Sequence, residues 1–400
     1  MSKMYYRELY CGTPVRFWMG LALLGAFIAI GLGAAFYMEH SGHWVTGMSN
    51  QIVWGLPHVF AIFLIVAASG ALNVASIGSV FGGPMYKPLG RYSSLLAIGL
   101  LAGGLMVLLL DLGRPDRLIV AMTEYNFKSI FAWNVILYSG FFAIVGVYLW
   151  TMMDRSVNKF YRPLGFVAFF WRIALTTGTG SIFGFLVARE AYDAAIMAPM
   201  FVIMSFSFGL AFFIITLIAA YLWSDRQIGE LRLAKLKNLL GVFVGAVLYF
   251  TLVYNLTNLY ATQHHGIERF ILLDGGIYTK MFWIGQVLIG GVLPLFLIYS
   301  PAFEKSRWAI AAASISVLIG GFSQVYVIVI GGQAYPMNIF PGKEVLESSF
   351  YDGVVNSYAP TLAEGALGVG GIAVALAMVA IGARMFKVFP ETLEDPNQEA

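Results

Sequence analysis

Long uncharged apolar runs alternate with short polar segments along most of the chain, between Lys3 and Lys387. The hydrocarbon core of a bilayer is about 30 Å thick and a helix rises about 1.5 Å per residue, so roughly 20 apolar residues cross it. Each spanning backbone amide must be satisfied within its own segment, which favours helices. We therefore expect an all-α integral membrane protein with about ten transmembrane helices, near residues 17–38, 54–81, 92–111, 129–150, 163–188, 196–223, 238–260, 280–300, 308–331 and 362–385.

The composition supports a membrane protein. Of the 400 residues, 59% are apolar and 11% are charged, whereas about 25% are charged in soluble domains. A soluble chain with so few charges would expose large apolar patches and aggregate. The net charge of +3 is too small to indicate a nucleic-acid partner. The expected surroundings of this chain are therefore the lipid bilayer.

The cysteine and histidine counts restrict the redox centres that this protein can hold. Cys11 is the single cysteine, which excludes a disulfide framework and a four-cysteine iron–sulfur cluster within this chain alone. A haem with two histidine ligands needs paired histidines on facing helices. His58 is the one histidine expected inside a span, because the other four fall in or beside outer loops: His40, His43, His264 and His265. We expect no haem, no iron–sulfur cluster and no metal site.

The distribution of basic residues predicts the orientation, because cytoplasmic loops are enriched in Lys and Arg. With ten spans, both termini and the even-to-odd loops share one side. That side holds sixteen basic residues: Lys3, Arg7, Arg16, Lys87, Arg91, Arg155, Lys159, Arg162, Arg226, Arg232, Lys235, Lys237, Lys305, Arg307, Arg384 and Lys387. The opposite side holds seven: Arg114, Arg117, Lys128, Arg189, Arg269, Lys280 and Lys343. We predict a multi-pass protein of the cell inner membrane with both termini cytoplasmic.

The segments outside the spans carry three further expectations. No cleavable signal peptide is apparent, so the first helix is expected to act as its own insertion signal. The outer loops 261–279 and 332–361 are the longest, and the second contains three prolines and several aromatics. It is a candidate docking surface for an extracytoplasmic partner, or an ordinary packed loop. The acidic, polar residues 391–400 are expected to form a disordered cytoplasmic tail.

Ionisable residues within spans are costly and therefore candidates for function. Asp111 ends the third span on the outer side, and His58 opens the second span on the same side. A neutral imidazole and a carboxylate at similar depth could accept the two protons of a hydroquinone, or donate to the carbonyls of a quinone. Two structural alternatives remain open: Asp111 pairs with Arg114 and fixes the turn, and His58 is an interfacial histidine with a hydrated ring.

Arg172 lies about nine residues into the fifth span, roughly 14 Å deep. Without an evident acid at that depth, it either extends toward the cytoplasmic headgroups or faces a polar interior. Hydroxyl residues continue beyond it, including Thr176 and Thr179, and together these residues could line a partial proton path. The alternative is that the hydroxyls bond to carbonyls of their own helix.

The run Asp111-Leu112-Gly113-Arg114-Pro115-Asp116-Arg117 resembles the signature turn of the polysulfide reductase NrfD family. The ten-span layout and the small-residue segment Ala68-Ser69-Gly70-Ala71-Leu72-Asn73 fit the same family. The stretch 55–150 is most similar to its DsrP branch, the quinone-interacting membrane subunit of the Dsr complex of sulfur metabolism. The resemblance covers most of the chain and is weak in the last loop.

The resemblance implies two four-helix bundles, at about 54–188 and 196–331 within a membrane domain of residues 1–390, with flanking helices. It implies a membrane subunit, itself non-catalytic or quinone-reactive, that exchanges electrons between menaquinone or ubiquinone and a ferredoxin-like iron–sulfur subunit on the periplasmic side. It places Asp111 and Arg114 at the quinone pocket, and His58 and Asn134 are weaker candidates. A c-type cytochrome would be a further partner in a Dsr-like complex, and a molybdenum subunit in a molybdoenzyme.

Two other functions remain open. A secondary transporter would use charged residues near the midplane and discontinuous helices in matching halves. Pro199 and Pro294 lie in spans, but they do not form a matched pair of broken segments. A purely structural anchor would keep the docking loops without binding quinone.

Overall fold

The computed structural model describes residues 5–10, 14–224, 226–304, 306–337, 353–391 and 393. Ten helices or helix series in this part are long and apolar enough to cross a membrane. They agree with the predicted spans to within a few residues, apart from the seventh, which begins earlier. Their elements are α1 (Pro14–Ser41), α2 (Leu56–Ala71) with α3 (Asn73–Ser79), η2 (Lys87–Leu89) with α4 (Gly90–Leu110), α6 (Ile130–Met153), η4 (Asn158–Phe160) with α7 (Tyr161–Gly184), α8 (Met197–Trp223), α9 (Glu230–Tyr260), α11 (Ile277–Lys280) with η7 (Met281–Val292) and α12 (Leu293–Tyr299), α13 (Arg307–Tyr326) with η9 (Val327–Gly331) and α14 (Gly332–Ala334), and α15 (Leu362–Met385).

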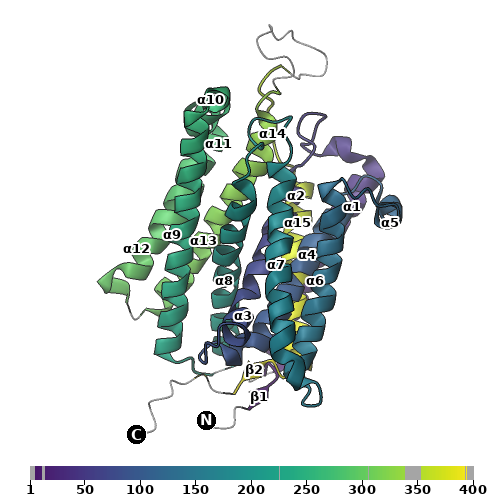
Figure 1. The fold of residues 1–400 in the computed structure, drawn as a ribbon. Helices are drawn as coiled ribbons and strands as arrows, with labels where there is room; N and C mark the ends of the chain where they lie inside the picture. Colours follow the sequence, from purple (N-terminus) through teal and green to yellow (C-terminus); the bar gives the residue numbers. More distant parts are fainter. Residues whose placement is uncertain are drawn as a thin grey trace.

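Short elements mark the two ends of the helix bundle (Figure 1). At one end, β1 (Tyr6–Arg7) pairs antiparallel with β2 (Phe389–Pro390), and we call this the strand end. The opposite end carries α5, α10 and α14, and we call it the loop end. The remaining short elements are η1 (His43–Val45), η3 (Pro115–Arg117), α5 (Leu118–Thr123), η5 (Thr262–His264), α10 (His265–Arg269), η6 (Phe270–Asp274) and η8 (Pro301–Phe303).

The helices pack as two four-helix groups with two flanking helices, as expected for the fold class. In the first group, α2, α4, α6 and α7 contact one another in a closed ring, with α3 beside α7. In the second group, α8 contacts α9 and α13, and the eighth span lies between those two helices. The groups meet where α8 packs on α2 and α7, and α15 lies against α4, α2 and α1. The described fold is therefore an all-α membrane protein.

Glycines allow the closest helix crossings, because a membrane offers no hydrophobic drive for association. Where α2 crosses α8, a Cβ added at Gly70 would lie 1.5 Å from the carbonyl oxygen of Ser205. Where α4 crosses α15, a Cβ at Gly103 would lie 2.3 Å from the carbonyl oxygen of Gly371. Side chains at these two positions would force the helices apart, so the glycines fix how the second and third spans sit against their neighbours.

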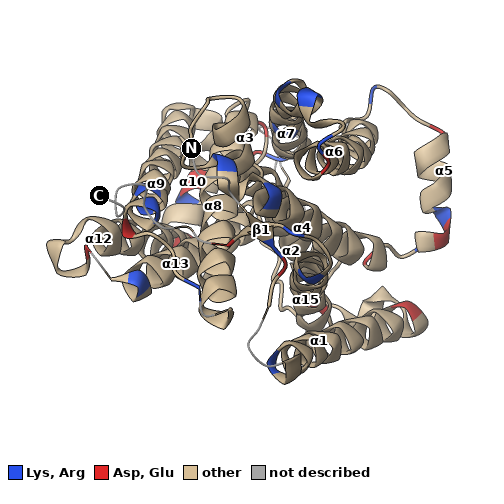
Figure 2. Ribbon diagram, turned by 90° about the horizontal axis from the view of Figure 1, so that it is seen from below, with Lys and Arg blue, Asp and Glu red and all other residues tan. Residues whose placement is uncertain are grey.

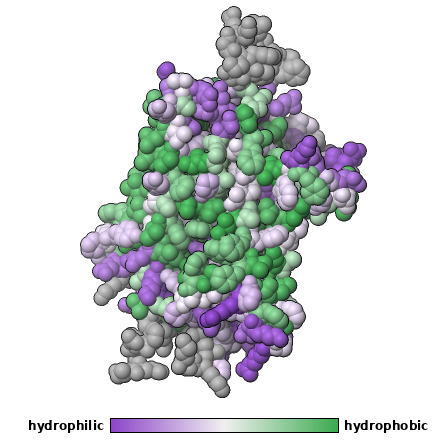
Figure 3. Space-filling view, viewed as in Figure 1, coloured by the Kyte–Doolittle hydropathy of each residue, from purple (hydrophilic) through white to green (hydrophobic). Residues whose placement is uncertain are grey.

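The outer surface is that of a bilayer-embedded protein. Apolar side chains dominate the middle of the face in Figure 3, and hydrophilic side chains gather toward the two ends. Large apolar side chains are exposed on α1 and α9, including Phe36 and Val242. Figure 2 looks onto the strand end, where the loops that are rich in Lys and Arg lie. The helices thus place the two sets of basic residues at opposite ends of the bundle, as the sequence predicts.

Part of the predicted tail is ordered. Glu391 forms an ion pair with Arg7, with a nitrogen–oxygen distance of 2.6 Å, and Leu393 is buried and pairs with Ile228. Disorder from residue 391 onward was therefore the wrong expectation for these two residues. The other tail residues, and positions 338–352 of the predicted docking loop, lie outside the described residues.

Candidate functional site

His58 and Asp111 meet at the loop end of the first helix group. His58 lies in the first turn of α2, and Asp111 follows the last residue of α4. The imidazole Nδ1 is 2.8 Å from the carboxylate Oδ2. The Asp111 side chain is fully buried, whereas 15% of the His58 side chain is exposed. The sequence placed both residues on one side of the membrane, and the structure brings them into direct contact.

This pair leaves hydrogen-bonding capacity open to a ligand. Among the described residues, no group completes a well-directed hydrogen bond to either oxygen of Asp111 or to Nδ1 of His58. The carboxylate beside Nδ1 favours a proton on that nitrogen and therefore a free lone pair on Nε2. Asp111 is sealed from solvent, so the imidazole is the exposed member of the pair. The described residues contain no group of three or more His, Cys, Asp or Glu that could hold a metal ion.

An aromatic cluster, which the sequence analysis did not identify, lies beside His58. The Trp54 ring is roughly parallel to the imidazole, with ring centroids 6.4 Å apart. Trp54 also contacts Phe131 of α6, Phe183 of α7 and Tyr192, with centroid distances of 6.1, 5.8 and 6.4 Å. The cluster presents flat apolar surface next to an ionisable pair, which suits a planar ring that carries polar oxygens.

The segment that leads into α2 is held from the second helix group. Gln333 of α14 accepts hydrogen bonds from the backbone N–H groups of Val53 and Trp54, both at 3.0 Å, and donates to the Trp54 carbonyl at 3.0 Å. Arg189 donates to the carbonyl oxygens of Gln333 and Gln51 at 3.0 and 2.8 Å. Sequence reasoning could not find this support, because residues about 280 positions apart form it.

A buried carboxylate holds the same segment from α15. Glu364 accepts hydrogen bonds from the Tyr358 hydroxyl at 2.7 Å and from the Gly47 N–H at 3.0 Å. The Tyr358 hydroxyl in turn accepts from the N–H of Leu56, the first residue of α2, at 2.6 Å. Glu364 lies in the first turn of α15, and these bonds give it a structural role.

Arg114 does not join the His58–Asp111 pair. Its guanidinium forms two hydrogen bonds of 3.1 Å with Asp116, and both side chains are exposed. The pairing raises the pKa of Arg114 and lowers the pKa of Asp116. The alternative in which Asp111 pairs with Arg114 is therefore wrong. Arg114 lies in the same turn, at the surface, and its place in a ligand pocket stays a prediction.

Asn134 is buried between α6 and α7 rather than beside His58. Its side-chain amide donates to the carbonyls of Ile130 and Gly178 at 2.9 and 3.1 Å. Its oxygen accepts from the Thr179 hydroxyl at 3.4 Å, and that hydroxyl lies 3.3 Å from the Tyr138 hydroxyl. No described contact joins Asn134 to the pair, so its part in binding quinone also stays a prediction.

Arg172 faces the interior of the bundle, where 1% of the residue is exposed. It donates to the side-chain oxygen of Asn73 at 2.8 Å, and the rings of Phe169 and Phe206 each lie 4.9 Å from its guanidinium carbon. Two of its nitrogens have no hydrogen-bond partner among the described residues. Arg172 therefore faces the bundle interior and not the headgroups, and Asn73 is the polar side chain that it contacts there.

The hydroxyls beyond Arg172 bond to their own helix. Thr176 donates to the Arg172 carbonyl and Thr179 donates to the Leu175 carbonyl, both at 2.9 Å. Such bonds are the common arrangement in membrane helices. No described hydrogen bond connects the side chains of Arg172, Thr176 and Thr179 in sequence, so a proton path along them stays a prediction.

These features define the class of protein. It is a multi-pass α-helical membrane protein with a buried ionisable pair and an aromatic cluster at one end of a four-helix group. The sequence model of the family described as polysulphide reductase, NrfD, matches residues 44–337, which include the His58–Asp111 pair and the aromatic cluster. The chain belongs to the NrfD polysulphide reductase family, as its signature turn predicted.

Three relatives extend the comparison. The chain is 26% identical to the Hdr-like menaquinol oxidoreductase integral membrane subunit of Archaeoglobus fulgidus, over 95% of each sequence. It is 22% identical to the menaquinone reductase integral membrane subunit of Nitratidesulfovibrio vulgaris, over 95% of this chain and 93% of the relative. It is 24% identical to the C component of the polysulfide reductase of Wolinella succinogenes, over 72% of this chain and 96% of the relative.

Proposed function

We propose that this chain is the quinone-reactive membrane subunit of an oxidoreductase complex and that His58 and Asp111 form its proton-exchanging pair. The observation that carries the proposal is the 2.8 Å contact between an accessible imidazole and a fully buried carboxylate. Two of the compared relatives are named for menaquinol or menaquinone, which supports menaquinone as the substrate class. Ubiquinone remains the alternative quinone.

The two residues have different roles in this proposal. Oxidation of one hydroquinone releases two electrons and two protons. Nε2 of His58 accepts one hydroxyl proton, and the adjacent carboxylate of Asp111 stabilises the imidazolium that forms. His58 passes this proton to water at its exposed edge and then accepts the second one. In quinone reduction the same steps run backward. Asp111 therefore acts through His58 and does not touch the quinone.

The electrons require a partner, because they leave this chain at the loop end. We propose a ferredoxin-like iron–sulfur subunit docked there, over the exposed turn that contains Arg114 and Asp116 and over α5. The predicted orientation makes this the periplasmic face. Two of the relatives are named as integral membrane subunits, which supports a multi-subunit complex, and sulfur metabolism is the context that the family resemblance favours.

Replacement of Asp111 tests the proposal. Asp111→Asn keeps the size of the side chain but removes the charge that stabilises the imidazolium. We expect quinol-linked turnover of the purified complex to fall by about a hundredfold, within the range for loss of general base catalysis. Co-purification of the partner subunits should not change.

Asp274→Asn is the matched control, because it removes an exposed carboxylate at the same end of the bundle, outside the turn and the helix over which the partner is proposed to dock. Its turnover should stay within twofold of the parent complex. Full turnover in Asp111→Asn, or an equal loss of turnover in both variants, would overturn the assignment of the pair.

A further inference from the structure

A second buried acid lies in the other helix group, away from the His58–Asp111 pair. Glu268 of α10 is 2% exposed, although the sequence places it in an outer loop between spans. Its Oε1 accepts a hydrogen bond of 2.7 Å from the Asn258 side chain. Its Oε2 has no hydrogen-bond partner among the described residues. A buried carboxylate oxygen without a partner is costly, which indicates that something else satisfies it.

Glu268 borders a cavity of about 40 Å³ inside the second group. On this measure a water needs about 10–15 Å³, so the cavity holds about three. Its polar lining consists of Thr251, Tyr254 and Asn255 of α9, Glu268, Gln286 of η7 and Gln324 of α13. The rest of the lining is apolar, but six polar side chains on the wall of a cavity of this size are enough to hold water. We call it the Glu268 chamber.

The hydrogen-bonding pattern of the lining suits a short chain of waters. The hydroxyl oxygen of Thr251 accepts from the amides of Gln286 and Gln324, at 3.2 and 3.4 Å. Its own proton is therefore free to donate into the chamber. Thr251 and Asn258 are seven residues apart on α9, about 10 Å along the axis. Three waters linked by hydrogen bonds of about 2.8 Å span roughly 11 Å, a length similar to the separation of Thr251 from Asn258, which binds Glu268.

The helices around the chamber are wider than ordinary α-helices. Three π-helical segments contribute to its wall: η6 through Ile271, η7 through Phe282 and Gln286, and η9 through Val327 and Ile328. π-Helical turns are rare and occur mostly at functional sites. The wider turns leave space at this place inside the bundle.

We infer that the Glu268 chamber is a hydrated proton-binding site in which Glu268 binds and releases a proton through internal water, at the loop end of the second helix group. This inference does not depend on quinone binding at His58. A proton fits better than a metal cation, because the amide of Asn258 presents N–H to Glu268, and those of Gln286 and Gln324 present N–H to Thr251. A cation would require oxygen ligands on all sides.

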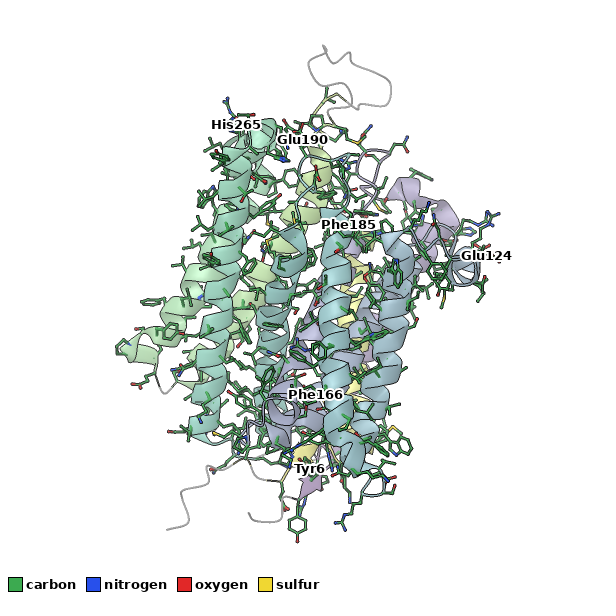
Figure 4. The ribbon with its side chains drawn as sticks, in the orientation of Figure 1. Tyr6, Glu124, Phe166, Phe185, Glu190 and His265 are labelled. Atoms are coloured by element: carbon green, nitrogen blue, oxygen red, sulfur yellow. The ribbon has the colours of Figure 1, made fainter. Side chains whose placement is uncertain are left out.

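The surroundings contain few other titratable groups. Tyr254 of α9 shares the lining, and its hydroxyl donates to the Ala191 carbonyl at 2.8 Å. In the same outer segment, His264 lies beside Gln263, His265 lies 2.8 Å from the Leu259 carbonyl, and Arg269 pairs with exposed Asp274. The lining residues on η6, η7 and η9 are apolar or carry amides. His265 marks the position of this segment at the loop end in Figure 4.

Burial raises the pKa of Glu268 to about 7, and the hydrogen bond from Asn258 opposes this rise. Glu268 is therefore expected to gain and lose its proton near neutral pH. This agrees with its position, because one carboxylate oxygen is buried beside the chamber without a hydrogen-bond partner among the described residues. Removal of the Asn258 amide should raise the pKa further.

Labelling with dicyclohexylcarbodiimide tests the inference in the purified complex. This apolar reagent adds to a protonated carboxylic acid and forms a stable N-acylurea that mass spectrometry locates. We expect the Glu268 adduct to decrease at least tenfold between pH 6 and pH 9. The adduct should be absent in Glu268→Gln, and Asn258→Ala should shift the half-labelling point to higher pH. Exposed Asp274 is the internal control and should react weakly throughout.

Difference infrared spectroscopy provides a second readout that does not depend on entry of the reagent. Glu268→Gln should remove a protonated carboxyl band at pH 6 that shifts in D₂O. Absence of any such band, labelling that does not change with pH, or protection from labelling by sodium but not by potassium would each overturn the inference, the last in favour of a cation site.

Discussion

The side-chain amide of Gln333 pairs with the backbone of Trp54 on both sides: it accepts from the Trp54 N–H and donates to the Trp54 carbonyl, each at 3.0 Å. Gln333 belongs to the ninth span, in the second helix group, whereas Trp54 leads into the second span and lies against His58. The contact therefore links the ninth span, in the second helix group, to the aromatic cluster beside His58 in the first.

Loss of this amide should release the segment before α2. Gln333→Leu removes the acceptor of two backbone N–H groups, and each such hydrogen bond contributes about 1 kcal/mol. We expect hydrogen exchange at Val53 and Trp54 to become about tenfold faster, with a higher KM for quinol, because Trp54 is no longer held beside His58. Gln263→Leu, at an exposed position of the loop end, is the control. Unchanged exchange at both amides would exclude this support role.

The raised pKa of Glu268 predicts how stability depends on pH. The folded protein holds this proton up to a pH of about 7, whereas the unfolded chain releases it near the ordinary value of 4.5. The folded state therefore binds more protons between these values, and its stability falls as pH rises through this window. The loss is up to about 3 kcal/mol.

Thermal unfolding measures this dependence. The nine tryptophans of the chain allow it to be followed by fluorescence in detergent. The midpoint should be higher at pH 5 than at pH 7.5, and Glu268→Gln should reduce that difference. Glu304→Gln serves as the comparison, because Glu304 lies at the strand end of the second group. Equal pH dependence in parent and Glu268→Gln would contradict the raised pKa.

The predicted orientation can be tested with single cysteines in a Cys11→Ser background. Asn126→Cys places a thiol at the loop end and Arg155→Cys places one at the strand end, and both positions are exposed. A membrane-impermeant maleimide added to intact cells should label position 126 through the outer face and leave position 155 unlabelled until the cells are lysed. The reverse pattern would invert the topology that the basic residues predict.

The sequence by itself determined the class of fold. In a bilayer, an apolar run of about twenty residues satisfies its backbone hydrogen bonds only as a helix. The first charged residues on either side of the run mark the ends of that helix. It also singled out Asp111 and His58, because burial of an ionisable side chain at membrane depth is costly and therefore indicates a function. The turn after Asp111 identified the family, because its glycine, arginine and proline lie at fixed spacing within a few residues.

Only the tertiary structure decided which polar groups meet. His58 lies against Asp111 while Arg114 turns to Asp116, and nothing in their spacing distinguishes those pairings. Gln333 reaches Trp54 across about 280 residues, and Glu268 was assigned to a loop because its neighbours in sequence are polar. Its burial depends on how α10 folds back onto α9 and on the π-helical widening of the eighth and ninth spans. The hydropathy of a segment shows whether that segment lies in lipid or in water. A binding site depends on contacts between segments, which hydropathy does not show.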